Sequence, residues 1–159
     1  MSDILSADNR LSVLSTAERY YRISDKFIQS CSDVSSLPNT VPTFHAGFGT
    51  WEGDLTLSKN GQHYILHFED SYQRISESRI DRVFTYDFRL HHNTIEIFRF
   101  DNHGKPLNHT AACHCHCGTG QRLLEGDPAL KQFSMVSLTL CDAVVIASAY
   151  VEEGKLPWL

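Results

Sequence analysis

The sequence lacks a long apolar run, an excess of basic residues and a leader-like start, and each absence removes a class of protein. No apolar stretch approaches the ~18 residues of a bilayer-spanning helix, so no membrane span is expected. Lys and Arg total 14 against 19 Asp and Glu, a formal net charge of −5. That balance argues against broad attraction to nucleic acid. Residues 1–6 hold no basic region followed by an apolar one, so an intracellular, cytoplasmic location is expected.

Internal repeats, low-complexity tracts and signs of a second domain are lacking as well. The chain of 159 residues is therefore expected to form a single domain, 1–159. Within it, residues 1–40 are predicted to be a helical segment and a linker, 41–118 an antiparallel sheet, and 119–159 a helical C-terminal segment. Hydrophobic residues make up 42% of the chain and charged residues 21%, which excludes a disordered chain.

Two helices are predicted, one toward each end of the chain. Ser15 and Glu18 have the spacing of a capping box, and the apolar residues that follow suit a helix. The residues expected on its apolar face are Ala17, Tyr21, Ile23, Phe27, Ile28 and Cys31. Residues 32–42, rich in Ser, Asp, Asn and Pro, predict a loop.

The second helix is predicted from Thr139 to Gly154, with Asp142 in its first turn. The residues expected to bury it are Val144, Val145, Ala147, Ala149, Tyr150 and Val151. Because 144–146 is β-prone, a strand there stays open as an alternative.

The middle of the chain alternates with the period of two that is typical of strands. Strands are predicted at 54–58, 63–69, 82–90, 94–101 and about 108–117, with a hairpin turn at Asn60-Gly61. Residues 71–80 are polar and predict a turn or a short helix. The expected fold class is α+β, an antiparallel meander sheet of about five to six strands with N-terminal and C-terminal helices packed on one face.

The alternation separates an aromatic face from a polar face. The aromatic positions Phe84, Tyr86, Phe88, Phe98 and Phe100 are expected in the core. The polar face then receives His63, His67, Glu69, Asp87, Arg89, Arg99 and Asp101. In 113–117 the cysteines share one parity and the histidines the other, so the histidines join the polar face if the cysteines join the core.

That polar face has the parts for acid–base chemistry on an anion. Histidine exchanges protons near neutral pH, and arginine binds phosphate and stabilises charge in a transition state. The candidate catalytic residues are Arg99, Asp101, His103, His109, His114 and His116. Arg99 is predicted to bind phosphate, His114 and His116 to act as acid and base, Asp101 to orient one histidine, and His103 or His109 to assist. The set predicts a metal-independent ribonuclease, an RNA-cleaving phosphodiesterase without a cofactor. The competing structural explanation is a row of surface ion pairs, each worth at most about 1 kcal/mol.

Zinc is the alternative cofactor, because the five cysteines, an odd number, include three that alternate with histidines. In a reducing compartment such cysteines are thiols or metal ligands rather than disulfides. The alternative ligands are Cys113, Cys115 and Cys117. In an extended strand Cys113 and Cys117 lie roughly 13 Å apart, too far to share one ion with ~2.3 Å bonds to sulfur. A zinc-binding interaction module would therefore need a bent segment or remote ligands such as His103, His109 or Cys141.

The segment 83–120 resembles the TumE-like toxin family of prokaryotic toxin–antitoxin systems. The resemblance rests on the run 85–90, on 97–104 and on the histidine-rich strand that follows. Arg99-Phe-Asp-Asn102 stands where the family has an Arg-Tyr-Asp-Asn-type motif. His109, His114 and His116 stand for the family's compact His-His-x-His cluster, here spread among cysteines.

The resemblance implies a growth-inhibiting toxin that is neutralised by a cognate antitoxin, commonly a helix-turn-helix protein. Ribonuclease action on an RNA substrate is the inference from the histidines and arginines themselves. A non-enzymatic antitoxin or immunity-type protein is the remaining alternative. The adjacent gene distinguishes the two, because a helix-turn-helix neighbour favours the toxin and a larger toxin gene favours the antitoxin.

Overall fold

The computed structural model describes residues 17–45, 48–76, 79–91, 96–102, 113–117, 130–133 and 138–156. Ser15 of the predicted capping box, His103 and His109 lie outside these residues. Within them, no helix is long and apolar enough to cross a membrane.

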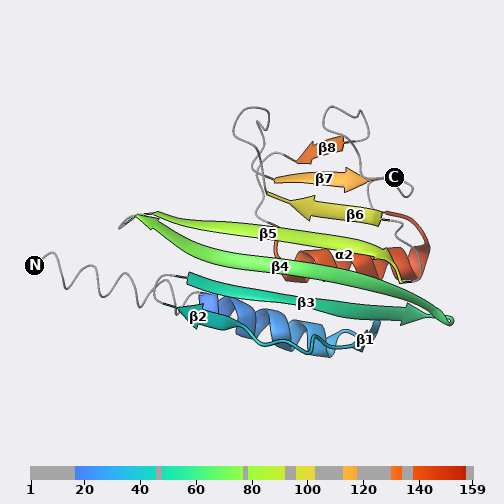
Figure 1. The fold of residues 1–159 in the computed structure, drawn as a ribbon. Coiled ribbons are helices and arrows are strands. Elements are labelled where there is room, and N and C mark those ends of the chain that lie inside the picture. The colour runs from blue at the N-terminus through green and yellow to red at the C-terminus, as the bar shows by residue number, and fades with distance from the viewer. Residues whose placement is uncertain are drawn as a thin grey trace, which may run out of the picture.

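In the described part of the chain, eight strands form one antiparallel sheet, and β3 to β8 follow one another across it in chain order (Figure 1). The edge beyond β3 carries the short strands β1 and β2, both paired with β3. The strands are β1 Val34–Ser36, β2 Thr43–His45, β3 Phe48–Lys59, β4 Gln62–Ser76, β5 Arg79–Leu90, β6 Glu96–Asp101, β7 Cys113–Cys117 and β8 Leu130–Phe133. The predicted α+β class and the meander are confirmed.

The turn between β3 and β4 is the predicted Asn-Gly hairpin. Asn60 has φ 51° and Gly61 has φ 77°, and Lys59 pairs with Gln62 across the turn. Positive φ at both central residues defines the type I′ turn, whose twist matches that of the flanking strands. The turn thereby fixes the register of the two long strands at the centre of the sheet.

The prediction of a turn or short helix at 71–80 is wrong, because β4 continues to Ser76 and β5 begins at Arg79. Ladder pairs such as Ser71 with Val83 join mostly polar positions there. The pairing uses backbone groups, so it does not require the apolar alternation by which strands are recognised. Strands also lie outside the predicted 41–118 range: β1 falls in the predicted loop, and β8 falls in the C-terminal segment. Both are three or four residues long, too short to show a period.

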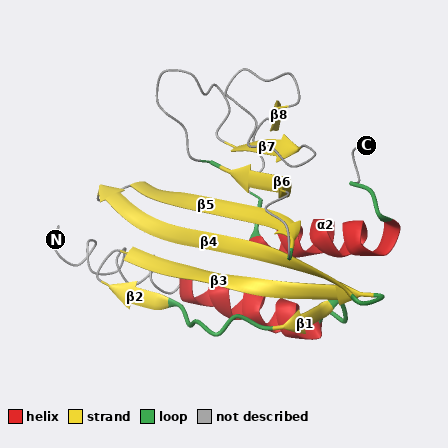
Figure 2. Cartoon of the chain, turned by 45° about the vertical axis from the view of Figure 1, so that its right-hand side comes forward, coloured by secondary structure: helices red, strands yellow, loops and turns green. Residues whose placement is uncertain are grey.

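The helix at 17–30 and helix α2, Leu140–Glu153, contact the same face of the sheet (Figure 2). Thr139 and Asp142 form a capping box, in which Thr139 N–H donates to Asp142 Oδ2 (2.8 Å) and Asp142 N–H donates to Thr139 Oγ1 (3.2 Å). Gly154 ends α2 in the left-handed conformation. The helix is confirmed, and the alternative strand at 144–146 is wrong.

Two residues of the predicted apolar faces lie on the solvent side. Ile23 is 57% exposed and Val145 is 54% exposed. Buried residues of the first helix follow spacings of four and seven, from Ala17 through Tyr21 to Ile28, and Ser24 fills the position between Tyr21 and Ile28. Ser24 lies 3.9 Å from Cys141 of α2, so a small side chain there lets the two helices approach.

The core lies between the helices and the aromatic face of the sheet, as predicted. Its sheet residues include Leu55, Leu66, Phe68, Tyr86, Phe88, Phe98 and Phe100, all buried. The rings of Phe88 and Phe98 lie 5.1 Å apart, and Tyr150 of α2 packs edge-on to Phe88 at 5.9 Å. Each fully buried side chain of this size contributes roughly 1.5–3 kcal/mol, so the aromatic face is the main source of stability.

One charged pair lies on this core face. Asp70 of β4 is 1% exposed, and Arg82 of β5 donates to both of its oxygens, from Nε at 2.9 Å and Nη2 at 2.6 Å. Tyr86 and Tyr20 donate to Asp70 Oδ2 at 2.5 and 3.0 Å. Arg82 Nη1 also donates to Leu138 O at 2.6 Å, and Leu140 N–H donates to the Tyr20 hydroxyl at 2.9 Å. This Asp70 cluster joins the first helix, two central strands and the start of α2.

Gly53 provides a test of how tightly the segment before β2 packs on the sheet. A Cβ at this position would meet Thr40 Oγ1 at 2.8 Å, Pro38 Cβ at 3.0 Å and Phe68 Cζ at 3.2 Å. We expect Gly53→Ala to lower the free energy of unfolding by about 1–3 kcal/mol, as overpacking does, measured by urea denaturation. Gly49→Ala is the control, because its Cβ would meet the movable Phe44 ring at 3.3 Å. Equal losses in the two variants would contradict this explanation.

Candidate functional site

The register brings charged residues from five strands into two rows on the sheet face opposite the helices, here called the polar face. In the first row Asp54 pairs with His67, His67 with Asp87, Asp87 with Arg99, and Arg99 with His116. In the second row Glu52 pairs with Glu69, Glu69 with Thr85, Thr85 with Asp101, and Asp101 with His114. Residues opposite one another in an antiparallel ladder belong to one face, so both rows lie on the polar face.

Arg99 is held by two carboxylates. Its Nε lies 3.1 Å from Asp101 Oδ2 and its Nη1 lies 3.5 Å from Glu96 Oε2. The side chain is 17% exposed, so the pairs are better shielded from water than ordinary surface ion pairs. A guanidinium carries five N–H donors, and these two contacts orient it without using them all. Arg99 is therefore a fixed cation at the centre of the polar face.

Among the described side chains of the first row, that of Asp87 is the most buried. Its side chain is 9% exposed, and Oδ2 pairs with Arg89 on the same strand. Among the described residues, Oδ1 of Asp87 and Nε of Arg89 are buried without a hydrogen-bond partner. An unsatisfied buried polar atom costs about 1–3 kcal/mol, so these two atoms stand out among the described residues of the polar face.

His67 lies between carboxylates at the other end of the row. Its Nδ1 is 2.7 Å from Asp54 Oδ1, and its Nε2 is 3.3 Å from Glu69 Oε1. Burial lowers the pKa of His67, but the hydrogen bonds to Asp54 and Glu69 outweigh it and hold the pKa above its ordinary value. Ligand atoms of His67, Glu69 and Glu52 all lie within 4.8 Å of one another.

The structure places the predicted catalytic residues unevenly. Arg99 and Asp101 are in contact. His116 and His114 occupy the register positions opposite them on β7, and only the backbone of β7 is described. His103 and His109 lie outside the described residues. The predicted catalytic roles therefore stay predictions.

The alternative zinc ligands lie on an extended strand. Cys113–Cys117 is β7, and Cys115 and Cys117 pair with Phe100 and Phe98 of the aromatic face. An extended strand separates Cys113 from Cys117 by roughly 13 Å, so these two cysteines do not share one zinc ion without a further rearrangement. Cys141, named as a remote ligand, is a free thiol on α2, on the helix side of the sheet.

Two residues of the polar face are not predicted from the sequence. Glu52 and Asp54 belong to β3, whose predicted range begins at Asp54. Extending the alternation of β3 toward its N-terminal end would have placed Glu52 beside Asp54 on the polar face. The pairing with His67 and Glu69 then follows from the hairpin register.

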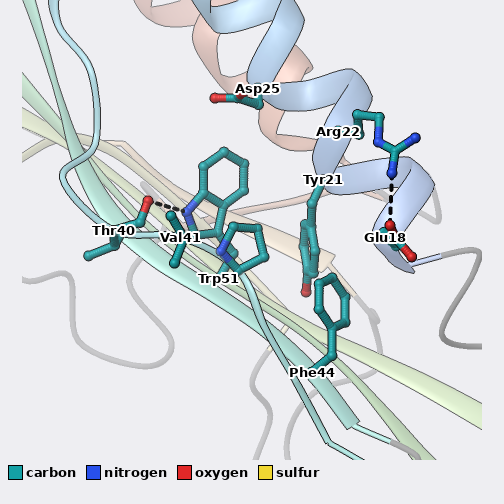
Figure 3. Close-up of a pocket in the computed structure, with 9 residues that line it drawn as sticks. Glu18, Tyr21, Arg22, Asp25, Thr40, Val41, Phe44 and Trp51 are labelled. Carbon is teal, nitrogen blue, oxygen red and sulfur yellow. Dashed lines mark hydrogen bonds and ion pairs between the residues drawn. The ribbon is translucent and has the colours of Figure 1, made fainter.

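A separate hollow lies between the first helix and the segment that leads into β2 (Figure 3). The rings of Tyr21, Phe44 and Trp51 and the ion pair of Arg22 with Glu18 line it. Tyr21 and Trp51 are buried, so the rings offer little contact area to a ligand. No histidine or cysteine is among the lining residues, and the hollow therefore lacks the acid–base groups of the polar face.

The polar face thus combines a fixed arginine, two register-paired histidine positions and a buried carboxylate. These parts are drawn from three consecutive strands, β5 to β7, and not from one local motif. No family model, curated protein or solved structure matches the chain, so the resemblance of 83–120 to TumE-like toxins stays a prediction and the function rests on the site's own residues.

Proposed function

We propose that the polar face is the catalytic surface of a metal-independent ribonuclease, and that the chain is the toxin-like member of a toxin–antitoxin pair. The observation that supports the proposal is the register at β6 and β7. It sets Arg99 opposite His116 and Asp101 opposite His114, with the Arg99–Asp101 pair at 3.1 Å. A phosphate-binding cation, its carboxylate partner and two imidazole positions thus lie on two neighbouring strands.

Each group has a defined task in cleavage of an RNA phosphodiester. One imidazole takes the proton of the ribose 2′-hydroxyl, whose oxygen then attacks phosphorus. The other imidazole gives a proton to the departing 5′-oxygen, and a 2′,3′-cyclic phosphate remains. Arg99 stabilises the extra negative charge on the phosphate oxygens in the transition state. Asp101 holds Arg99 and lies opposite His114, where a carboxylate can orient an imidazole.

The charge distribution supports a small substrate contact. The chain carries a net charge of −5, and Arg99 is surrounded by Glu96, Asp101 and the paired position of Asp87. These carboxylates offset the charge of Arg99, and the negative surface repels a long nucleic acid, so contact with RNA would depend on hydrogen bonds from Arg99 to one phosphate. We therefore expect cleavage at exposed single linkages of a flexible RNA and weak overall binding.

The central test compares histidine variants in a cleavage assay. His114→Ala and His116→Ala are each expected to lower the rate of RNA cleavage by about 10²- to 10⁴-fold, the usual contribution of a general acid or base. The assay contains a chelator, and the substrate is a single-stranded RNA with a matched oligonucleotide that lacks the 2′-hydroxyl at every position. The matched DNA is expected to stay intact, because it has no internal nucleophile.

The matched control is His45→Ala. His45 is exposed on β2, at the opposite edge of the sheet, so the same substitution there should leave cleavage unchanged. Equal cleavage by the wild-type chain and the His114→Ala/His116→Ala double variant would remove the catalytic assignment. Cleavage of the DNA oligonucleotide would exclude the 2′-hydroxyl mechanism.

The toxin role has a separate test in cells. Tightly controlled expression of the wild-type chain is expected to arrest growth, and expression of the double histidine variant is not. Co-expression with the product of the adjacent small gene should restore growth if that product is the antitoxin. Growth arrest of equal strength by both chains would contradict a toxin that acts through these histidines.

A further inference from the structure

Glu52, His67 and Glu69 form a cluster on the central strands β3 and β4, away from Arg99 and β7. Their ligand atoms lie within 4.8 Å of one another. The strands that carry them are paired without interruption from Phe48 to Lys59, so the backbone positions are fixed by the sheet. Rigid strands hold ligand atoms more exactly than loops do.

The two glutamates face each other directly across the ladder. Like charges in directly opposite positions destabilise an antiparallel pair. Glu69 and Glu52 are both exposed, so water weakens this repulsion without removing it. A divalent cation between them would turn the repulsion into attraction.

The imidazole of His67 is oriented by a fourth residue. Asp54 lies 2.7 Å from Nδ1 of His67, which directs Nε2 toward Glu69. Histidines that bind metals nearly always donate their other ring N–H to such a carboxylate, which fixes the tautomer and makes the ligand nitrogen more basic. Asp54 is in the position of that outer partner.

A second observation, on the next strand, concerns a buried carboxylate oxygen opposite His67. Asp87 is opposite His67 on β5, its side chain is nine-tenths buried, and its Oδ1 has no hydrogen-bond partner among the described residues. Oδ2 of Asp87 already has a positive charge beside it in Arg89, and Oδ1 lacks a hydrogen-bond donor. Water bound to a cation at His67 would be such a donor on this side of the row.

We propose that Glu52, His67 and Glu69 bind a divalent transition-metal ion, with Asp54 as the outer partner of His67. One nitrogen and two carboxylate oxygens suit Zn²⁺, and three protein ligands leave an open coordination position. The ligand atoms of Glu52, His67 and Glu69 lie within 4.8 Å of one another. Around a Zn²⁺ ion, with bonds of roughly 2.0–2.2 Å, ligand atoms lie closer together than that. Rotation of the exposed glutamates closes that difference. The site is distinct from the acid–base residues on β6 and β7, and its occupancy does not depend on ribonuclease activity.

The test measures binding of Zn²⁺ to the chelator-stripped full chain by isothermal titration calorimetry. We expect one ion per chain. Asp54→Asn should weaken binding by about 10- to 100-fold, as loss of an outer partner does, and Glu52→Gln or Glu69→Gln should weaken it at least as much. Glu153→Gln, an exposed carboxylate at the end of α2, is the matched control and should bind as the wild type does.

Two further measurements separate this site from the cysteines of β7. The Co²⁺ complex should show d–d bands without the sulfur-to-cobalt charge-transfer band of a thiolate ligand. In the metal-free protein Glu69→Gln should raise Tm, because it removes the repulsion, and added Zn²⁺ should raise the Tm of the wild type and of Glu153→Gln more than that of Glu69→Gln. Absence of Zn²⁺ binding, wild-type affinity in Glu69→Gln, or a thiolate charge-transfer band would each overturn the proposal.

Discussion

Asp70→Asn is expected to lower the free energy of unfolding by about 3–5 kcal/mol, because it leaves the Arg82 guanidinium buried without its counter-charge. Arg82 is 12% exposed in its side chain and makes both short contacts to Asp70. Its position over the Phe84 ring, 4.6 Å from the centroid, leaves little access for water. Urea denaturation followed by circular dichroism gives the free energy, and an unchanged m-value shows that the transition is still comparable.

Asp54→Asn is the matched control for this prediction. It makes the same chemical change in an ion pair whose carboxylate is mostly exposed, so its cost should be no more than about 1 kcal/mol. A loss below about 1 kcal/mol in Asp70→Asn as well would show that the Asp70 cluster does not stabilise the fold.

The double variant Asp70→Asn/Arg82→Met tests the physical cause. When both charges of a buried pair are removed, the desolvation cost of each disappears with the attraction. We expect the double variant to be more stable than the sum of the two single losses predicts. The difference is the coupling energy of the pair. Additive losses would mean that the two side chains act through separate contacts.

Strands of the sheet could be predicted only where apolar and polar side chains alternate. Tyr64, Leu66 and Phe68 show the period of two, and the sequence predicts this part of β4. The same strand continues through Asp70 and Tyr72, which keep the parity of the core face. The predicted strand ends at Glu69, before a polar stretch, and the core position that follows holds an aspartate, a residue rarely buried without a partner. The partner, Arg82, is 12 positions along the chain, and only the hairpin register brings the two together.

The candidate site was predictable in the same limited way. Parity alone put Asp87, Arg99 and Asp101 on one face, and the register agrees. Contacts among these residues depend on the strand order and on the bulge between Phe88 and Arg89. Neither can be predicted from the local spacing of residues in the sequence. Glu52 and His67 are 15 positions apart and come together through the Asn60-Gly61 turn. Such a cluster can be predicted from the sequence only when the register of the hairpin is taken into account.

The helix ends were predictable because their chemistry is local. The capping box of Thr139 and Asp142 and the left-handed Gly154 each involve residues within one turn. The face of α2 that packs on the sheet was harder to predict than its ends, because Val145 is exposed while Ala143 is buried. A small alanine lets α2 lie close to the aromatic face, and the larger valine fits better on the solvent side. Hydrophobicity alone ranks these two residues in the wrong order.

Tyrosines around the Asp70 cluster make the fold sensitive to high pH. Burial raises the pKa of Tyr72 to about 12, and burial and the charge of Asp70 raise the pKa values of Tyr20, Tyr21 and Tyr86 well above their ordinary value. In the unfolded chain these groups ionise near pH ~10. The unfolded state therefore loses protons first as the pH rises, and the free energy of unfolding falls. Their contribution is complete below pH ~10 and is lost as the pH rises through the folded-state pKa values.

The expected result is cooperative alkaline unfolding that begins above pH ~10. Tyrosinate absorbance should stay low until the near-ultraviolet circular dichroism disappears, and the two signals should then change together. Tyr72→Phe removes one of the coupled protons and should move the midpoint of alkaline unfolding to higher pH. Tyr20→Phe should not, because the ring keeps its packing but Asp70 and the Leu140 N–H lose a hydrogen-bond partner. If tyrosinate absorbance instead grows near pH ~10 while the fold stays intact, these hydroxyl groups are accessible to water. That result would contradict the close packing of the first helix against β4 and β5.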